Sequence, residues 1–422
     1  MKNSDHLASQ LQSQQQGQDD QEILQNANRI VIKLGSHVFL ELIKNRDNAL
    51  LSAEEKAGFY SLINQCVQLI QLKKQVILVS SGAVALGQAQ LNLTETELSL
   101  SQKQACAAVG QTMLMQEYKA ALGMAGLVPA QVLLTAHDFS DRKHYLSLQQ
   151  TLESMLALNI VPIINENDVT STAGIEEVAQ SMGFKDNDML SALVASRLNA
   201  DLLVVLTNVK GIYTENPVSN SQAKPISHVA RLTELDAITA HGQSSAGRGG
   251  MESKLEAVKA AARSGITTYI TSGLDPAPLS ALLPATVSEP NSEQEPATKP
   301  AGTLIEPANA MKDKQRWIGM ASGYEGIIVV NDGAEAALRF KQASILPIGV
   351  VSVHGQFVAQ QVISVHNSRG KELARGLSNF SSDEIEKMRG KQSQDIHLAL
   401  GQREAVQRPE VIHRDDLVVF PE

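Results

Sequence analysis

Short apolar runs alternate with stretches of helical periodicity between residues 29 and 273. The apolar runs are rich in Val and Ile and nearly continuous, which is typical of strands covered on both faces of a sheet. The stretches between them repeat apolar residues every three or four positions, as in Phe59, Leu62, Ile63 and Cys66. This alternation predicts an α/β fold with an open, mostly parallel sheet sandwiched by helices.

The predicted elements follow one another closely along the chain. We expect strands at 29–36, 75–82, 128–134, 160–168, 200–208 and 265–273, and helices at 52–72, 101–122, 142–158, 188–198 and 251–264. The first of these helices begins with a capping box, in which Glu55 follows Ser52 by three residues.

Polar residues gather where the predicted strands end. The first strand ends in Lys33, Gly35 and Ser36, and the others end in Ser81-Gly82, in Asn165 to Asp168 and in Thr207-Asn208. In open α/β sheets, ligands bind outside the carboxyl ends of the strands. A lysine with free backbone N–H groups there suits an anion, although a merely solvated Lys33 is the alternative.

The flanks of this region have a different composition. Residues 1–27 are rich in Gln, Asp, Ser and Asn, which predicts a disordered tail, with a helix that forms on a partner as the alternative. Residues 275–312 include a Pro-, Ser- and Glu-rich stretch and predict a flexible insertion and linker after a domain at 28–274. Short β-type runs with Gly and Asn turns in 313–422 predict a small, mainly β second domain.

Composition narrows the class of protein. The chain has 422 residues with a formal net charge of −9, which disfavours a nucleic acid as the main partner. Cys66 and Cys106 are far apart, so we expect small buried hydrophobes in a reducing, cytoplasmic protein. No apolar run approaches the ~20 residues that cross a bilayer, and the N-terminus lacks the apolar segment of a signal peptide.

The glycine-rich segment GRGGMESK, residues 247–254, opens a predicted helix. Backbone N–H groups at a helix start bind phosphate, and Lys254 is close enough along the helix to reach the same anion. The segment is not a P-loop, because Arg248 and Gly249 stand where a P-loop has Lys and Ser/Thr, and no strand precedes it. A glycine-rich surface turn is the alternative.

Two acidic and amide clusters lie between a buried strand and the next helix: INEND at 164–168 ends the predicted strand, and KDND at 185–188 opens the predicted helix at 188–198. For Asp186, helix capping alone is the alternative to a functional role. Asn187 and Asp188 could bind an amino acid or orient lysines. Zinc spacings, GxSxG and GxGxxG are absent, so no metal-ligating residue is predicted. Lysines and glycine loops around one cleft favour phosphoryl transfer, and a carboxylate acceptor needs no general base because it is already ionised.

The ordered set of KLGS, VSSGAVALG, INEND, DND-LSAL, LLVVLTNVKGIY and GGMxSK resembles the glutamate 5-kinase family. NDGAEAAL, SILPIGVVSVHG and VIHRDDLV resemble the PUA domain attached to bacterial members. The resemblance implies the amino acid kinase fold, and it implies ATP-dependent phosphorylation of the γ-carboxylate of L-glutamate in proline biosynthesis. It also implies Mg²⁺ as cofactor, proline as a feedback inhibitor and a homo-oligomer, either a dimer or a tetramer.

The resemblance implies a role for each matching position. Four residues match catalytic positions: Lys33, Lys254, Asp188 and Asp186. Four match glutamate-binding positions: Ser81, Gly82, Asp168 and Asn187. The ATP-binding positions are Lys33, Gly35, Ser36, Thr207, Asn208, Arg248, Gly249, Gly250, Met251, Glu252, Ser253 and Lys254.

The chain departs from the family pattern at several of these positions. Asn208 stands where Asp is usual, Arg248 and Ser253 where Thr is usual, and Lys185 where Gly is usual. The loop at 171–184 is longer than expected and carries Glu176 and Glu177. We expect these changes to alter affinity and feedback more than the reaction type.

Two alternative functions remain open at this point. The chain could be a related kinase with another acceptor, such as an acetylglutamate kinase or an aspartokinase. It could also act through RNA by its PUA-like domain, although the charge balance disfavours this.

Overall fold

A computed structural model describes residues 15–43, 57–95, 97–135, 138–139, 142–170, 186–215, 217, 220–235, 248–284, 301–308, 313–321, 324–392, 395–401 and 409–420. The chain divides into two compact units, and the larger comprises Met1–Thr135, Leu146–Gly174 and Phe184–Ala310. Each unit is described separately. No helix of the described residues is long and apolar enough to cross a membrane.

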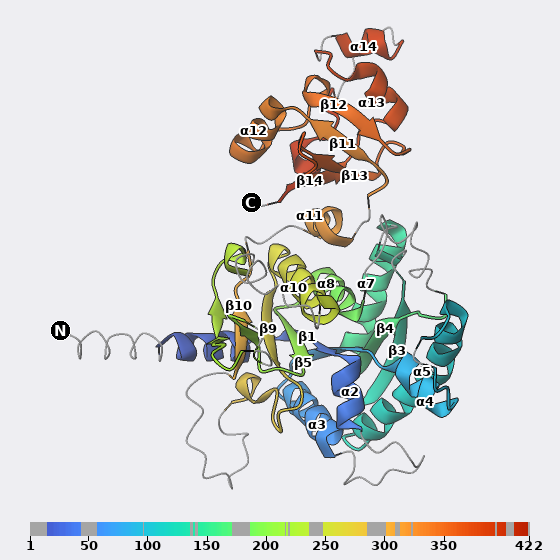
Figure 1. Ribbon diagram of the computed structural model, residues 1–422, viewed down its shortest axis with the longest axis vertical. Helices are drawn as coiled ribbons and strands as arrows, with labels where there is room; N and C mark the ends of the chain where they lie inside the picture. Colours follow the sequence, from blue (N-terminus) through green and yellow to red (C-terminus); the bar gives the residue numbers. More distant parts are fainter. Residues whose placement is uncertain are drawn as a thin grey trace, which may run out of the picture. The chain divides into compact units, whose positions relative to one another are not determined.

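The described residues of the larger unit form an eight-stranded sheet in the order β3-β4-β2-β1-β5-β9-β10-β8 (Figure 1). All neighbouring strands pair in parallel except β9 and β10, which confirms the predicted open, mostly parallel sheet. The strands are β1 (Arg29–Leu34), β2 (Gln75–Ser80), β3 (Val128–Leu134), β4 (Ile160–Glu166), β5 (Leu202–Thr207), β8 (His228–Val229), β9 (Thr267–Ser272) and β10 (Gly302–Ile305).

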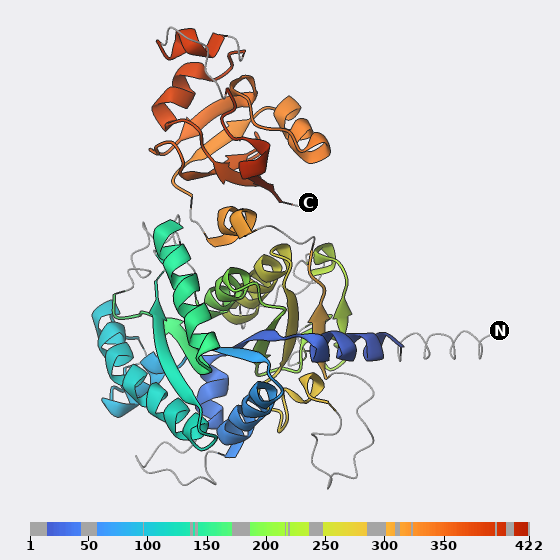
Figure 2. The same cartoon turned by 180° about the vertical axis from the view of Figure 1, so that it is seen from behind.

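Helices cover both faces of this sheet, as Figures 1 and 2 show from opposite sides. On one face lie α2 (Ser36–Leu42), α3 (Ala57–Gln71), α4 (Ala83–Gln90) and α5 (Leu100–Gly123). On the other lie α7 (Arg142–Ala157), α8 (Asn187–Arg197) and α10 (Arg248–Arg263). The sequence did not predict α2 and α4, because both start within a residue or two of a strand end. The predicted capping box at Ser52 and Glu55 lies outside the described residues.

Alternate side chains of β1 face different helices on the two sides of the sheet. In β1, Ile30, Ile32 and Leu34 belong to the core cluster that contains side chains of α3 and α5. Because side chains alternate along a strand, Lys33 points to the opposite face, where α8 packs on β1. The lysine near the end of a buried strand is thereby directed toward a helix that carries carboxylates.

Two glycines let α4 and α5 cross at very short range. A Cβ atom added at Gly87 would overlap the carbonyl oxygen of Cys106, and one added at Gly110 would overlap the carbonyl oxygen of Ala83. The backbones therefore touch where only glycine leaves room. This crossing fixes α4, whose first residues follow the carboxyl end of β2.

The predicted disordered tail is wrong for residues 15–27. Residues 15–26 form a helix, and Leu24 is fully buried in the core of the larger unit. Asp20 of this N-terminal helix is also buried and pairs with His228 Nδ1 at 2.8 Å, while His228 Nε2 lies 3.0 Å from Glu306. The low hydrophobicity of residues 1–27 as a whole predicted disorder, although apolar residues such as Leu24 pack into the core.

The predicted flexible insertion is also wrong at both of its ends. Leu279, Leu282 and Leu283 lie in the core, and β10 adds an antiparallel strand next to β9. Residues 285–300 lie outside the described residues. The sequence did not predict β10 because the Pro-, Ser- and Glu-rich stretch before it suggested a linker, although β10 belongs to the main sheet.

The smaller unit has its own sheet and core, which confirms the predicted mainly β second domain. Its sheet has the order β12-β11-β13-β14-β15 among the described residues. The strands are β11 (Ile327–Val330), β12 (Val350–His354), β13 (Val362–His366), β14 (Glu372–Leu377) and β15 (Leu417–Val419), with helices α12 (Asp332–Lys341), α13 (Ser382–Met388) and α14 (Ile396–Ala399). Side chains such as Ile328, Ile363 and Ile385 form a separate apolar cluster.

Candidate active site

A cavity of about 510 Å³ opens at the carboxyl ends of β1, β2, β4 and β5. It brings together twelve of the residues predicted from sequence, which come from distant parts of the chain. These are Lys33, Gly35, Ser36, Ser81, Gly82, Asp168, Asp186, Asn187, Asp188, Thr207, Asn208 and Lys254. The parallel sheet explains the convergence, since strands that run in one direction end at one edge.

Lys33 lines this cavity, is almost completely buried and forms an ion pair. Its Nζ lies 2.6 Å from Asp188 Oδ1, and both side chains are more than nine-tenths buried. Burial lowers the pKa of Lys33, and the neighbouring Asp188 carboxylate opposes that shift. A Cβ at Gly35 would lie 3.2 Å from the same Nζ, so glycine leaves space for the ammonium group. The alternative of a merely solvated lysine is therefore wrong.

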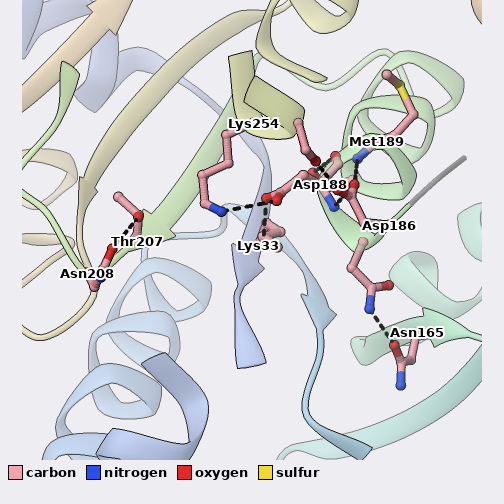
Figure 3. Close-up of polar contacts among 11 residues, drawn as sticks. Lys33, Asn165, Asp186, Asp188, Met189, Thr207, Asn208 and Lys254 are labelled. Atoms are coloured by element: carbon pink, nitrogen blue, oxygen red, sulfur yellow. Dashed lines mark hydrogen bonds and ion pairs between the residues drawn. The ribbon is translucent and has the colours of Figure 1, made fainter. Parts of the chain in front are cut away.

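Lys254 reaches the same carboxylate from the opposite side. It lies in the second turn of α10, and its Nζ is 3.3 Å from Asp188 Oδ2. Figure 3 shows Lys33 and Lys254 converging on Asp188. The two lysines thus face one cleft, as the sequence hypothesis required.

Asp186 caps α8 as well as lining the cavity. Its Oδ1 accepts hydrogen bonds from the backbone N–H groups of Asp188 at 3.0 Å and Met189 at 3.1 Å, which satisfies two free donors of the helix start. Its Oδ2 accepts from the hydroxyl of Ser253. This carboxylate fixes Asp188 at the helix start and joins α8 to α10.

Uncapped helix starts make the cavity suitable for anions. The N-caps of α2 and α4 are Gly35 and Gly82, and neither supplies a side-chain hydrogen bond to its helix. Gly82 has φ 116°, in the left-handed region that favours glycine. Both residues line the cavity beside the two lysines, so free N–H groups and positive charge face the same space.

A polar wall forms the β4 side of the cavity. Asp168 lies there, and burial raises the pKa of its carboxyl group. Asn165 also lines the cavity and accepts a hydrogen bond from Asn187 at 2.9 Å (Figure 3). Asn165 was not among the predicted site residues, although the INEND motif contains it. Glu166, of the same motif, also lines the cavity and was not among the predicted site residues. His37 and Gln88 line it as well and carried no sequence signal.

The predicted ATP loop is described only in part. Residues 248–250 begin α10, but their side chains are not described. Met251, Glu252 and Ser253 are described and lie outside the cavity lining, in contrast to Lys254. Thr207 donates a hydrogen bond to Asn208 at 3.2 Å, and both line the cavity. Lys185 and the loop at 171–184 lie outside the described residues.

The comparisons with known proteins agree with this geometry. Residues 28–272 match the model of the amino acid kinase family, and residues 326–400 match the PUA domain. A glutamate 5-kinase from Trichlorobacter lovleyi is 39% identical over 94% of this chain and 98% of its own. The chain belongs to the glutamate 5-kinase family.

A second relative gives the same result. A glutamate 5-kinase from Gloeobacter violaceus is 41% identical over 82% of this chain and 89% of its own. Among solved structures, a carbamate kinase from Giardia lamblia bound to AMP-PNP aligns with a TM-score of 0.43 and 16% identity over 67% of this chain and 100% of that one. That likeness is too weak to bear on function. Membership of the glutamate 5-kinase family confirms the resemblance seen in the motifs and the expected kinase class.

Proposed function

We propose that this cavity is where the γ-phosphoryl group of ATP passes to the γ-carboxylate of L-glutamate, the first step of proline biosynthesis. The observation that carries the proposal is the Lys33–Asp188–Lys254 arrangement, with both ammonium groups on one buried carboxylate. Two fixed positive charges at one point suit a reaction in which three anionic groups meet: the acceptor, the transferred phosphoryl and the leaving diphosphate.

The chemistry needs positioning more than proton transfer. The γ-carboxylate of glutamate is ionised at neutral pH, so it attacks without a general base. Lys33 and Lys254 offset its repulsion from the phosphates, and Asp188 holds the two lysines in place. His37 lines the cavity, but this mechanism assigns it no proton transfer.

Roles for the remaining residues follow from their position in the cavity. Ser81, Gly82, Asp168 and Asn187 hold glutamate on the side of β2 and β4. Gly35, Ser36, Thr207, Asn208 and the start of α10 from Arg248 to Lys254 hold ATP.

Magnesium fits this site through the nucleotide. Asp188 is paired with two lysines and Asp186 caps α8, so the carboxylates near the phosphates are already engaged. Mg²⁺ prefers phosphate oxygens and water with few protein ligands. Bound to ATP, Mg²⁺ neutralises phosphate charge.

The hydroxamate assay tests this function. Full-length protein with glutamate, ATP, Mg²⁺ and hydroxylamine is expected to yield γ-glutamyl hydroxamate. Lys254→Met is expected to lower turnover about 100-fold, whereas Lys119→Met, which removes an exposed lysine on α5, leaves it unchanged. Phosphorylation of aspartate or N-acetylglutamate in place of glutamate would contradict the proposal.

Regulation and assembly belong to the same proposal. We expect proline to inhibit the reaction, the chain to form a dimer or tetramer, and the protein to be cytoplasmic, because the family resemblance implies these properties. The hydroxamate assay with and without proline tests the first, and sedimentation velocity tests the second.

A further inference from the structure

Three side-chain amides form a chain from α5 to the cavity. Asn165 at the end of β4 donates from Nδ2 to Gln111 Oε1 on α5 at 2.9 Å, and Asn187 at the start of α8 donates from Nδ2 to Asn165 Oδ1 at 2.9 Å. Gln111 and Asn165 are 7% and 1% exposed. Asn165 and Asn187 line the cavity, whereas Gln111 lies behind them.

One backbone group sets the direction of the whole chain. The N–H of Glu166 donates to Asn165 Oδ1 at 2.9 Å, and a backbone N–H can only donate. Asn165 must therefore present its oxygen to Glu166 and its Nδ2 to Gln111. Asn187 must in turn present its Nδ2 to Asn165, so its own oxygen is directed away from the chain. The amide orientations follow from this single fixed donor.

The chain ends on α5 in Gln111 Nε2, a buried donor without a hydrogen-bond partner among the residues described, and it ends at the cavity in an acceptor. Asn187 Oδ1 is buried and has no hydrogen-bond partner among the residues described, although Asn187 lines the cavity. A buried acceptor without a donor is costly, so a ligand group that donates there is favoured. The Asp168 carboxylate lines the same cavity, and the two together favour a cationic donor such as a primary ammonium group.

We propose that Gln111 is a positioning residue for recognition of the substrate's α-ammonium group. The inference rests on the proposed function, in which an amino acid is the acceptor. Gln111 supplies the acceptor that holds Asn165 Nδ2. Asn165 then holds Asn187 with its oxygen available to the ammonium. Without an acceptor at position 111, Asn165 Nδ2 loses its partner and Asn165 gains freedom to leave the orientation that aims Asn187.

Substitutions at position 111 test this role in the full-length enzyme. Gln111→Met and Gln111→Leu both remove the acceptor but differ in shape, so a packing fault in one does not decide the result. Gln111→Glu keeps an acceptor oxygen. Gln116→Met changes an exposed glutamine on the same helix and is the matched control.

The measurement compares the KM for glutamate with the KM for ATP in each variant. Gln111→Met and Gln111→Leu are expected to raise the KM for glutamate about tenfold or more, while the KM for ATP stays within about twofold. Gln111→Glu is expected to restore the KM for glutamate, and Gln116→Met to leave it unchanged. The inhibition constant of glutarate, which lacks the ammonium group, is expected to stay unchanged in all four variants.

The contrary outcomes are distinct. An unchanged KM for glutamate in folded Gln111→Met and Gln111→Leu would overturn the role of Gln111. An equal rise in the KM values for glutamate and ATP would show that Gln111 has only a structural role, and this would also overturn the proposal. Failure of Gln111→Glu to restore the KM for glutamate would have the same meaning. Failure of the unsubstituted protein to make γ-glutamyl hydroxamate would instead overturn the proposed function.

Discussion

The Asp188 carboxylate lies 2.6 Å from the ammonium group of Lys33, and both side chains are almost completely buried. The second oxygen of Asp188 faces Lys254 at 3.3 Å. One carboxylate is therefore the counterion of two lysines. Loss of either lysine leaves Asp188 paired, whereas loss of the carboxylate leaves Lys33 buried without this partner.

Asp188→Asn is expected to lower both stability and turnover. Lys254→Met is expected to lower turnover with little effect on stability. Breaking the buried pair by removing Asp188 is expected to lower the free energy of unfolding by about 3 kcal/mol. Lys254→Met is expected to lower it by less than about 1 kcal/mol, because Asp188 keeps Lys33. Both variants are expected to lose about 100-fold in turnover. Urea unfolding and hydroxamate rates measure the two effects, and a larger stability loss in Lys254→Met would contradict the shared-counterion role.

Gly110→Ala is expected to disrupt the site from a distance. The added methyl group overlaps the carbonyl oxygen of Ala83, so α4 must move, and with it the helix start beside Ser81. We expect a loss of about 2 kcal/mol in unfolding free energy together with a raised KM for glutamate.

Gly123→Ala is the matched control for that substitution. Gly123 ends the same helix and has no atom within 4 Å of an added Cβ. It is expected to stabilise the protein by a few tenths of a kcal/mol and leave kinetics unchanged. Equal effects of the two alanines would show that close packing at Gly110 does not matter.

The raised pKa of Asp168 predicts how glutamate binding depends on pH. Burial disfavours the charged carboxylate, so Asp168 takes up its proton at a higher pH than a solvated aspartate does. Once protonated, it no longer attracts an ammonium group. The KM for glutamate is expected to rise as the pH falls through the raised pKa of Asp168, at a higher pH than a solvated aspartate would give, with little change in the KM for ATP.

Asp168→Asn separates the stability of the protein from its function. A carboxyl whose pKa is raised on folding contributes stability below its unfolded pKa and loses it as the pH rises through the folded pKa. The amide variant is therefore expected to melt at a higher temperature than the unsubstituted protein at neutral pH, but not at acidic pH. Glutamate binding is expected to be lost. A lower melting temperature at neutral pH would contradict the burial of charge at this position.

The N-terminal helix is expected to be part of the folded larger unit. Leu24→Ala removes a fully buried side chain and is expected to lower the free energy of unfolding by about 3 kcal/mol. Its neighbour Ile23 is 39% exposed, so Ile23→Ala is expected to cost less than about 1 kcal/mol. Chemical unfolding of the two variants measures the difference, and equal small losses would mean that this helix contributes little.

Local patterns predicted most of the strands and longer helices, because buried strands and amphipathic helices have different apolar periods. They failed where the structure depends on contacts between distant segments. β10 is a four-residue strand whose place is fixed by pairing with β9, and the helix at 15–26 is anchored by Leu24 in a core formed mostly by other segments. The helices α2 and α4 start so soon after their strands that the apolar pattern shows no boundary.

The sequence alone determined the sheet, the family and the candidate residues at the strand ends. The opening motif placed Lys33 in a buried strand, and the ordered motifs resembled the glutamate 5-kinase family. The tertiary structure alone decided that Lys33 and Lys254 share Asp188, that Asp186 both caps α8 and binds Ser253, and that Gln111 supports Asn165 from another helix. These contacts join residues that are far apart in the sequence, and Lys33 and Lys254 are more than 200 positions apart. The periodicity of apolar residues describes only neighbouring positions, so it cannot predict how distant side chains are placed relative to one another.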